Sequence, residues 1–447
     1  MKYEFQTLTP IWTGGIDSKN MDRIDETNIV GHLRWWYEAI VRGLGGYACD
    51  INSENPCSGE KDTICDACRL FGNTGKRRLF RLNISGGNKL FIGPPRSILI
   101  PSGRIHPYKR SGRTEYRLGG WYLHGESFTG EISMKILPLS KEFEPNQFNL
   151  LVYLISNYGS IGGKISSGYG ALKIREIEEG TINLENSNFH ISHQKNRNCN
   201  YELPSIDDMF FAKYQFASPL DCQNWWINIE GFNYIDRNIV KDYVSDRPIS
   251  RFVFKRGEKD QGKKIFRSII EGGICPISPP LRDMLRRELE KNSNFQLANY
   301  LFGSTRNLCP TCYSSKIRSN NQQNNEFICA QCRSRIEKSK LINPLASKIN
   351  ISYAYKTDNN LWEFRVWGWI PRSFPLSLTY KKKKFDREIF LKDLRRVLID
   401  KQKSEALFGQ KNIVIKEIDW HSCDSEIPDG HNYLKELLQS TNNEGVI

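Results

Sequence analysis

The chain has 447 residues, a length typical of two or three domains that each bury their own apolar core. It contains no run of about 18 apolar residues, and its first residues lack the charged-then-apolar pattern of a signal peptide. We therefore expect a cytoplasmic protein and no membrane partner. The net charge of +14 favours an anionic partner such as nucleic acid, although many soluble proteins are basic without one.

The sequence pattern at the start of the first half predicts a strand followed by a helix. Side chains alternate through residues 3–7, which indicates a strand. Apolar residues then recur at the helical period from Val30 to Val41, and Arg34 and Trp35 occupy the other face of that predicted helix.

Two strands and a second helix follow, near residues 80–84, 128–134 and 147–157. Between the two strands, residues 104–117 mix cations with two tyrosines and a histidine. Cations interleaved with stacking rings suit a single strand of nucleic acid, and a solvated hairpin is the alternative interpretation. The candidate RNA contacts in this part of the chain are Arg104, Lys109, Arg110 and Arg113, together with Lys76, Arg77 and Arg78.

A glycine-rich loop joins the second helix to the last strand of the first half. Residues 159–170, with the sequence GSIGGKISSGYG, include many positions able to adopt positive φ and backbone N–H groups free to approach phosphates. This loop adds four candidate RNA contacts, Gly162, Gly163, Lys164 and Gly168.

Four cysteines lie between the first helix and this sheet. Cys49, Cys57, Cys65 and Cys68 have two wide gaps and end in a CxxC pair, a pattern that favours a zinc ion in a reducing compartment. The alternative is a CxxC pair in a polar loop, with Cys49 buried as a small apolar side chain.

The second half repeats the order of the first, and the tripeptide Leu-Phe-Gly occurs in both, at residues 70–72 and 301–303. Two copies of this order fit the split βαβ pattern of an α+β, ferredoxin-like fold, with residues 176–215 as a linker or insertion. The elements expected in the second half are a strand at 226–229, a helix opened by Pro279 and Pro280, a hairpin at 349–366, a helix at 386–401 and a strand at 412–418.

A second cysteine group follows the second Leu-Phe-Gly. Cys309, Cys312, Cys329 and Cys332 form two CxxC pairs sixteen residues apart, which matches a zinc ribbon. Four thiolates leave no open coordination position, so the predicted zinc is structural. Two reactive disulfides are the alternative, which a reducing cytosol disfavours.

The sequence shows no familiar catalytic pattern. The nearest approaches to a phosphate-binding P-loop, at residues 72–76 and 159–164, have the wrong spacing, and no His-x-x-Glu-His or Gly-x-Ser-x-Gly motif occurs. We therefore expect a protein that binds rather than one that catalyses.

Three segments together resemble the RAMP superfamily of CRISPR-associated proteins, and within it the family of Cmr subunit one of type III-B effector complexes. They are GHLRWW at residues 31–36, CDACRLFG at 65–72 and GGKISSGYG at 162–170. The resemblance runs through most of the chain, but residues 85–125 and 176–245 match poorly.

The resemblance implies two ferredoxin-like (RRM-like) RAMP domains with inserted zinc-binding loops. They would span residues 1–175 and 216–447, with the zinc ribbon at 309–332 in the second. It also implies a non-catalytic subunit that contacts CRISPR guide RNA toward its 3′ end, helps capture single-stranded target RNA in antiviral defence and assembles with other Cmr subunits. Carried over by position, Arg34, Trp35 and the glycine-rich loop become RNA contacts.

The second half departs from the family pattern, because the sequence ALFGQ at residues 406–410 stands where a second glycine-rich loop would fall. Two other functions stay open. One is a RAMP-type endoribonuclease that processes guide RNA, with His32 or a basic residue assisting the 2′-hydroxyl. The other is a zinc-ribbon protein that binds DNA or another protein.

Overall fold

The protein is described here from a computed structural model of the whole chain. For β3, β4 and β8, introduced below, it describes the backbone alone. The described residues are 1–14, 21–50, 57, 64–91, 98–110, 113–123, 125–178, 189, 191, 203–217, 253–254, 264, 268–292, 295–304, 306–321, 326–372, 378–408, 411–423 and 429–440.

The first half forms a four-stranded antiparallel sheet in the order β2-β5-β1-β6. Tyr3 and Phe5 on β1 point into the core while their neighbours face outward, so the alternation in the sequence is confirmed. The elements of this half are β1 (Lys2–Thr7), α1 (Glu26–Gly43), α2 (Asp66–Phe71), β2 (Phe80–Phe91), β3 (Ile98–Arg110), β4 (Arg113–Leu123), β5 (Glu126–Pro138), α3 (Pro145–Tyr158) and β6 (Leu172–Glu178).

The second half forms a sheet in the order β18-β7-β15-β14-β9, with β13 also paired to β15. Its helical elements are α6 (Ser278–Asn292), α7 (Phe295–Phe302), α8 (Arg387–Leu398), α9 (Lys401–Phe408) and α10 (Gly430–Ser440). Its strands are β7 (Met209–Phe216), β8 (Val253–Phe254), β9 (Ile274–Cys275), β10 (Ile317–Asn321), β11 (Glu326–Cys329), β12 (Arg335–Glu337), β13 (Ile349–Ile351), β14 (Ala354–Lys356), β15 (Trp362–Trp369), β16 (Thr379–Tyr380), β17 (Lys383–Lys384) and β18 (Lys416–Ser422).

The two sheets share part of their strand order. In the first sheet, β1 lies between β5 and β6, and β2 pairs with β5. In the second sheet, β7 lies between β15 and β18, β13 and β14 pair with β15, and β9 adds a further strand beside β14. The chain topology is therefore compatible with the repeat expected from the sequence, with additional strands in the second half.

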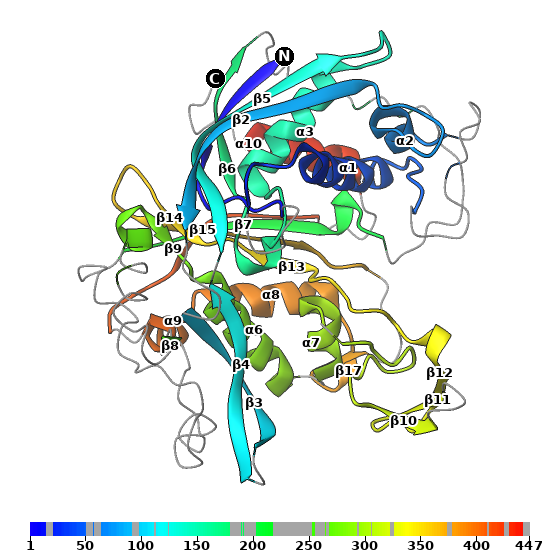
Figure 1. The fold of residues 1–447 in the computed structure, drawn as a ribbon, viewed down its shortest axis with the longest axis vertical. Helices are drawn as coiled ribbons and strands as arrows, with labels where there is room; N and C mark the ends of the chain where they lie inside the picture. Colours follow the sequence, from blue (N-terminus) through cyan, green and yellow to red (C-terminus); the bar gives the residue numbers. More distant parts are fainter. Residues whose placement is uncertain are drawn as a thin grey trace.

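The molecule is built in four layers, visible from top to bottom in Figure 1: the first sheet, helices α1, α3 and α10, the second sheet, and helices α6, α7 and α8. The contact between helix α1 and the second sheet is aromatic. Trp36 of α1 is 1% exposed, and its ring lies 6.0 Å from that of Phe211 on β7 and 5.0 Å from that of Trp367 on β15. The second sheet is thus covered on both faces, which explains why β7 and β15 are apolar along almost their whole length.

Helix α10 returns to the first half of the molecule. Its Leu434, Leu437 and Leu438 belong to the same core as α1 and α3. Tyr158, the last residue of α3, donates a hydrogen bond to the Leu437 carbonyl at 2.8 Å and is 2.6 Å from the Ser440 hydroxyl. The two halves are therefore interlocked by the end of the chain.

One expectation about the middle of the chain changes, and another is untested. Residues 176–215 are predicted as a linker or insertion, but β6 continues to Glu178 and Met209–Phe216 forms β7, which is central in the second sheet. The strand predicted at residues 226–229 lies outside the described residues.

Among the described helices, none is long and apolar enough to cross a membrane.

Candidate nucleic-acid interface and metal centres

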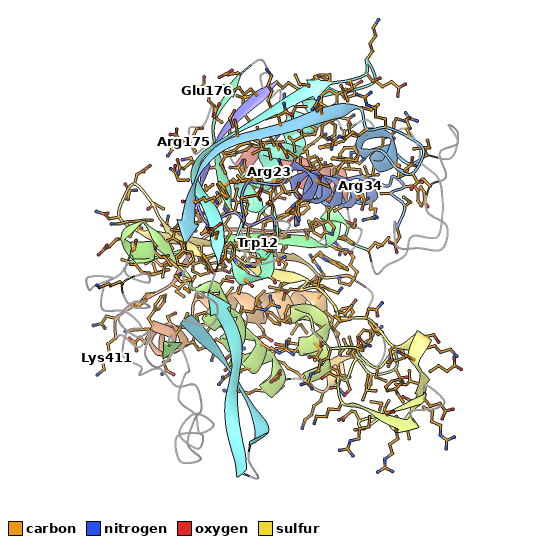
Figure 2. The ribbon with its side chains drawn as sticks, viewed as in Figure 1. Trp12, Arg23, Arg34, Arg175, Glu176 and Lys411 are labelled. Carbon is orange, nitrogen blue, oxygen red and sulfur yellow. The ribbon has the colours of Figure 1, made fainter. Side chains whose placement is uncertain are left out.

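Arg34 holds α1 against the turn that follows α2. Its guanidinium donates to the Glu38 carboxylate at 2.8 Å, to the Gly72 carbonyl at 2.7 Å and to the Cys68 sulfur at 3.1 Å. Its side chain is only 15% exposed, and burial raises the pKa of Glu38 although Arg34 and Arg42 oppose that shift. The predicted RNA contact Arg34 is thus occupied by protein partners (Figure 2).

The same arrangement occurs in the second half. Arg286 of α6 donates to Glu290 at 3.2 Å, four residues further along the helix, and to the Gly303 carbonyl at 3.2 Å. Gly72 and Gly303 end the two Leu-Phe-Gly tripeptides, with φ of +81° and +75°. An added Cβ would lie 2.8 Å from the Lys76 carbonyl oxygen in the first turn, so the turn requires glycine. The repeated tripeptide therefore marks a repeated arginine clamp.

Trp35 packs at the junction of the halves. Its ring lies 5.5 Å from that of Trp36, edge to face, and 6.1 Å from that of Trp367. It is partly buried, so only part of the ring is available to a ligand.

The glycine-rich loop also lies between the halves, beside Trp12 (Figure 2), which contacts both main cores. Lys164 has φ of +55°, and its ammonium group lies 4.2 Å from the centre of the Trp12 ring. Burial lowers the pKa of Lys164. Close packing explains two glycines: an added Cβ would lie 2.8 Å from the Trp12 carbonyl oxygen at Gly162 and 2.6 Å from the Trp12 ring at Gly163.

Gly168 brings the loop against the second half. The amide of Tyr353 donates to the Gly168 carbonyl at 2.9 Å, and Arg282 donates to the Ser166 carbonyl at 3.1 Å. An added Cβ on Gly168 would lie 2.3 Å from the Tyr353 ring, and its φ is +105°. The loop is therefore a joint between the halves as well as a candidate RNA contact.

The remaining predicted contacts lie on two segments, the turn after α2 and the β3–β4 hairpin. Lys76, Arg77 and Arg78 follow α2, with Arg77 exposed and the Arg78 guanidinium 5.7 Å from the centre of the Phe80 ring. The residues Arg104, Lys109, Arg110 and Arg113 lie on β3 and β4, which pair as a long antiparallel hairpin. Their side chains lie outside what the structure describes. Figure 1 shows this hairpin beside α6, extending to the bottom of the molecule.

The structure brings the first cysteine group together. The sulfurs of Cys49, Cys57, Cys65 and Cys68 all lie within 4.8 Å of one another, and those of Cys49 and Cys68 are 3.5 Å apart. Cys65 is the N-cap of α2, so this short helix begins at the cluster. The two wide gaps in the sequence therefore close around one point.

The ribbon cysteines form two matched knuckles. In each, the residue after the second cysteine has positive φ, +56° at Tyr313 and +59° at Arg333, and its amide donates to the carbonyl of the first cysteine. The sulfurs of Cys309 and Cys332 are 3.6 Å apart, as are those of Cys312 and Cys329. All four lie within 4.8 Å of one another.

Both groups have a donor set that could hold a metal ion. A zinc ion with Zn–S distances of about 2.3 Å at the centre of a tetrahedron places its sulfurs roughly 3.8 Å apart. The measured separations of 3.5 and 3.6 Å are close to that value. Four sulfur ligands suit zinc or an iron–sulfur cluster rather than magnesium or calcium.

A cleft of about 1270 Å³ lies between the halves, lined by β1, β6 and α3 on one side and by β7, β14 and β15 on the other. Lys213 and Arg365 pair across β7 and β15 and are each 5% exposed. Arg365 donates to the Gly159 and Leu172 carbonyls at 3.2 and 3.1 Å. The sequence signal for this pair is a cation in the middle of an apolar strand.

The cleft carries both signs of charge. Arg175 and Glu176 lie next to each other on β6 (Figure 2), and both are exposed at its lining. Lys356 and Asp358 are close in the chain on the opposite side. A surface of mixed sign attracts a nucleic-acid backbone less than a uniformly basic one.

His32, the candidate base of the endoribonuclease alternative, lies on α1. Burial lowers its pKa to about 4, so its ring is neutral near pH 7. A neutral ring can accept a proton, and the half-buried position of His32 leaves only part of the ring open to a substrate.

The chain is similar to known proteins, and the family match lies in its first half. The family model described as the RAMP superfamily matches residues 4–173. Among solved structures, the chain is similar to Cmr1 from Pyrococcus furiosus in its apo form, with 11% identity, 93% of this chain and 97% of that chain covered, and a TM-score of 0.31. It is also similar to a chain of the type III-B Cmr-beta complex bound to cognate target RNA, with 11% identity, coverage of 88% and 98%, and a TM-score of 0.35. No curated protein matches the sequence.

Proposed function

Because the RAMP superfamily model matches residues 4–173, we propose that this protein is a non-catalytic, RNA-binding subunit of a type III-B CRISPR effector complex. In this role it contacts the guide RNA toward its 3′ end, helps capture target RNA and assembles with other subunits of the complex. The family match carries the proposal, since it includes helix α1, the first cysteine cluster and the glycine-rich loop. The net charge of +14 is consistent with an RNA partner.

The fold supports a finer proposal, that the chain contains two ferredoxin-like RAMP domains with inserted metal-binding loops. The partly shared strand order of the two sheets and the matched clamps of Arg34 and Arg286 support it. We place the start of the second domain at β7, because Met209–Phe216 belongs to the second sheet.

The contacts of each candidate divide the proposed RNA-binding residues into two groups. The β3–β4 hairpin and the segment 76–78 lie outside the core and supply the direct contacts. Arg34 and Trp35 are occupied by protein neighbours, so they position α1 and the cysteine cluster. Lys164 is partly exposed beside Trp12 and belongs with the direct contacts.

Each cysteine cluster is proposed to hold one structural zinc ion. Zinc would fix the loop of Cys49 to Cys68 against α1, where Arg34 donates to the Cys68 sulfur. In the ribbon it would join the two knuckles, which share only a small apolar cluster that includes Ile336. Measurement of about two zinc ions per purified chain is the expected result.

The function is tested by the affinity of the purified protein for a labelled single-stranded RNA, measured by fluorescence anisotropy against duplex DNA at the same salt concentration. We expect a preference for RNA, and weaker binding for Arg110→Ala combined with Arg113→Ala. Lys435→Ala, an exposed cation on α10, is the matched control and should bind as the wild type does. Equal binding by all of these proteins, or none by the wild type, would contradict the proposal.

The endoribonuclease alternative predicts a different outcome in a second assay. Incubation of the protein with CRISPR repeat RNA should leave the RNA intact if the subunit proposal is right. Specific cleavage that is lost in His32→Ala would favour the enzyme. Co-purification of guide RNA and other subunits from cells would identify the complex directly.

A further inference from the structure

The first knuckle of the zinc ribbon, residues 304–342, fixes the ribbon to helix α7 of the second half. Tyr313 of the first knuckle is 6% exposed, and its ring packs edge to face on Tyr300 at 5.2 Å. Asn299 of α7 donates to the Tyr313 carbonyl at 3.2 Å. Leu308 and Ile342 exchange two backbone hydrogen bonds at the base of the ribbon.

The second knuckle has the same backbone but faces solvent. Arg333 takes the place of Tyr313, with the same positive φ, and its side chain is exposed. Figure 1 shows β10, β11 and β12 at the edge of the molecule, away from both large sheets. One knuckle therefore anchors the ribbon, and the other presents a cation.

The ribbon sheet extends this cationic surface. Arg318 on β10 pairs with Ile328 on β11, which pairs in turn with Arg335 on β12, so the three side chains share one face. Both arginines are exposed. Because neighbouring strands lie about 4.8 Å apart, their backbones are roughly 10 Å apart, with a half-buried isoleucine between them.

The charge of the ribbon is not balanced within it. Residues 304–342 contain seven lysines and arginines and two glutamates. The two glutamates, Glu326 and Glu337, pair with each other on the face of Arg335, two residues along their strands, and Glu337 also lies 3.5 Å from Lys340. A divalent ion with four thiolates carries two negative charges, which still leaves an excess of positive charge. The exposed cations without an ion pair to any described residue are Arg306, Arg318, Arg333, Arg335 and Lys338.

We infer that the exposed, unpaired cations of the ribbon, Arg318, Arg333, Arg335 and Lys338, form a second binding site for single-stranded RNA. Arginine predominates, and a guanidinium can both bind phosphate with two hydrogen bonds and stack on an unpaired base. The inference rests on the proposed function. It assigns an RNA contact to the second half, where helix α9 occupies part of the position expected for a second glycine-rich loop. The ribbon zinc ion would hold this surface in place without touching the RNA.

The test compares two triple variants that remove the same net charge from the second half. One is Arg318→Ala, Arg333→Ala and Arg335→Ala, and the control is Lys392→Ala, Lys411→Ala and Lys416→Ala, three exposed lysines elsewhere (Lys411 is labelled in Figure 2). Zinc content and melting temperature are measured for both, and should equal those of the wild type because all six side chains are exposed.

Binding to a labelled single-stranded RNA is then measured over a range of salt concentrations. The arginine variant should bind about tenfold more weakly, and the slope of log K against log salt should fall by about 2, as expected for three lost phosphate contacts. The lysine control should change by less than about twofold. Equal losses in the two variants, or none in either, would overturn the ribbon site. Absence of RNA binding by the wild type would instead overturn the proposed function.

Discussion

Replacing Arg34 with methionine separates a structural role from an RNA contact. Methionine keeps much of the length and apolar volume of the arginine stem but removes three donors, those to Glu38, Gly72 and Cys68. The Glu38 side chain, 10% exposed, would retain only Arg42 at 3.4 Å. Breaking a buried ion pair costs roughly 3 to 5 kcal/mol, and the remaining partner favours the lower end, about 3 kcal/mol.

The loss of stability in Arg34→Met is measured as a shift in the midpoint of urea-induced unfolding, and the slope of the transition converts that shift into a free energy. A second change, Glu38→Gln, removes the charge that Arg34→Met leaves buried. We expect the double variant to be more stable than Arg34→Met by at least about 1 kcal/mol. Arg286→Met should cost less than Arg34→Met, because the Glu290 side chain is 38% exposed and can be hydrated.

RNA affinity decides between the two roles. If Arg34 acts only as a clamp, the folded Arg34→Met protein binds RNA within about threefold of the wild type. The structural role would be refuted if the Arg34→Met variant unfolded at the same urea concentration as the wild type but bound RNA about tenfold more weakly. Arg34 would then be a direct RNA contact.

Three further predictions concern the joint, the ribbon and a buried acid. Gly168→Ala should lower the free energy of unfolding, measured in urea, by about 2 kcal/mol, because the added Cβ would meet the Tyr353 ring and the φ of this residue is +105°. The control is Gly31→Ala, since nothing lies near a Cβ added at that position. Equal stability of the two variants would argue against the glycine-rich loop as a joint between the halves. Cys329→Ser should reduce zinc from two ions to one per chain by elemental analysis, and full retention would exclude the ribbon as a zinc site. Burial raises the pKa of Asp208 to about 7, so its contribution to stability is present at low pH and is lost as pH rises toward 7. Asp208→Asn should therefore melt higher than the wild type at pH 8, with the gain declining toward pH 4, and a gain independent of pH would contradict this cause.

The sequence predicts best what depends on short spacing. The two CxxC pairs of the ribbon specify its knuckles, and the alternation through Tyr3 and Phe5 specifies β1. The structure also brings Cys49 and Cys57 to the closing CxxC pair, as the sequence suggests. These features follow from local geometry, since ligands or side-chain faces are set by residues near one another in the chain.

The environment of α1 is harder to predict, because its second partner comes from far along the chain. The helical period assigns Arg34 and Trp35 to an outer face, and that face would be solvent in a single two-layer domain. Here Trp367, about 330 residues further on, lies against the Trp35 ring, whereas Arg34 is held by Glu38, Gly72 and Cys68 of the first half. Packing partners distant in the chain, rather than periodicity, decide what these two side chains contact.

Strand β7 is hidden from sequence analysis for a related reason. The sequence MFFAKYQF does not alternate, because both faces of the strand are buried, and the expected linker at 176–215 includes most of it. Lys213 interrupts the apolar run and resembles a solvent-facing residue, although it faces the cleft between the halves.

The return of α10 to the first half has a consequence for how the chain folds during synthesis. The core of the first half lacks Leu434, Leu437 and Leu438 until α10 has left the ribosome. At about 5 to 20 residues per second, the interval between the end of β6 and the end of α10 is roughly 10 to 50 s. During that time α1 and α3 carry an uncovered apolar surface, which also awaits the second sheet. A nascent chain of this protein is therefore a natural client for chaperones, and its first half reaches its final packing last.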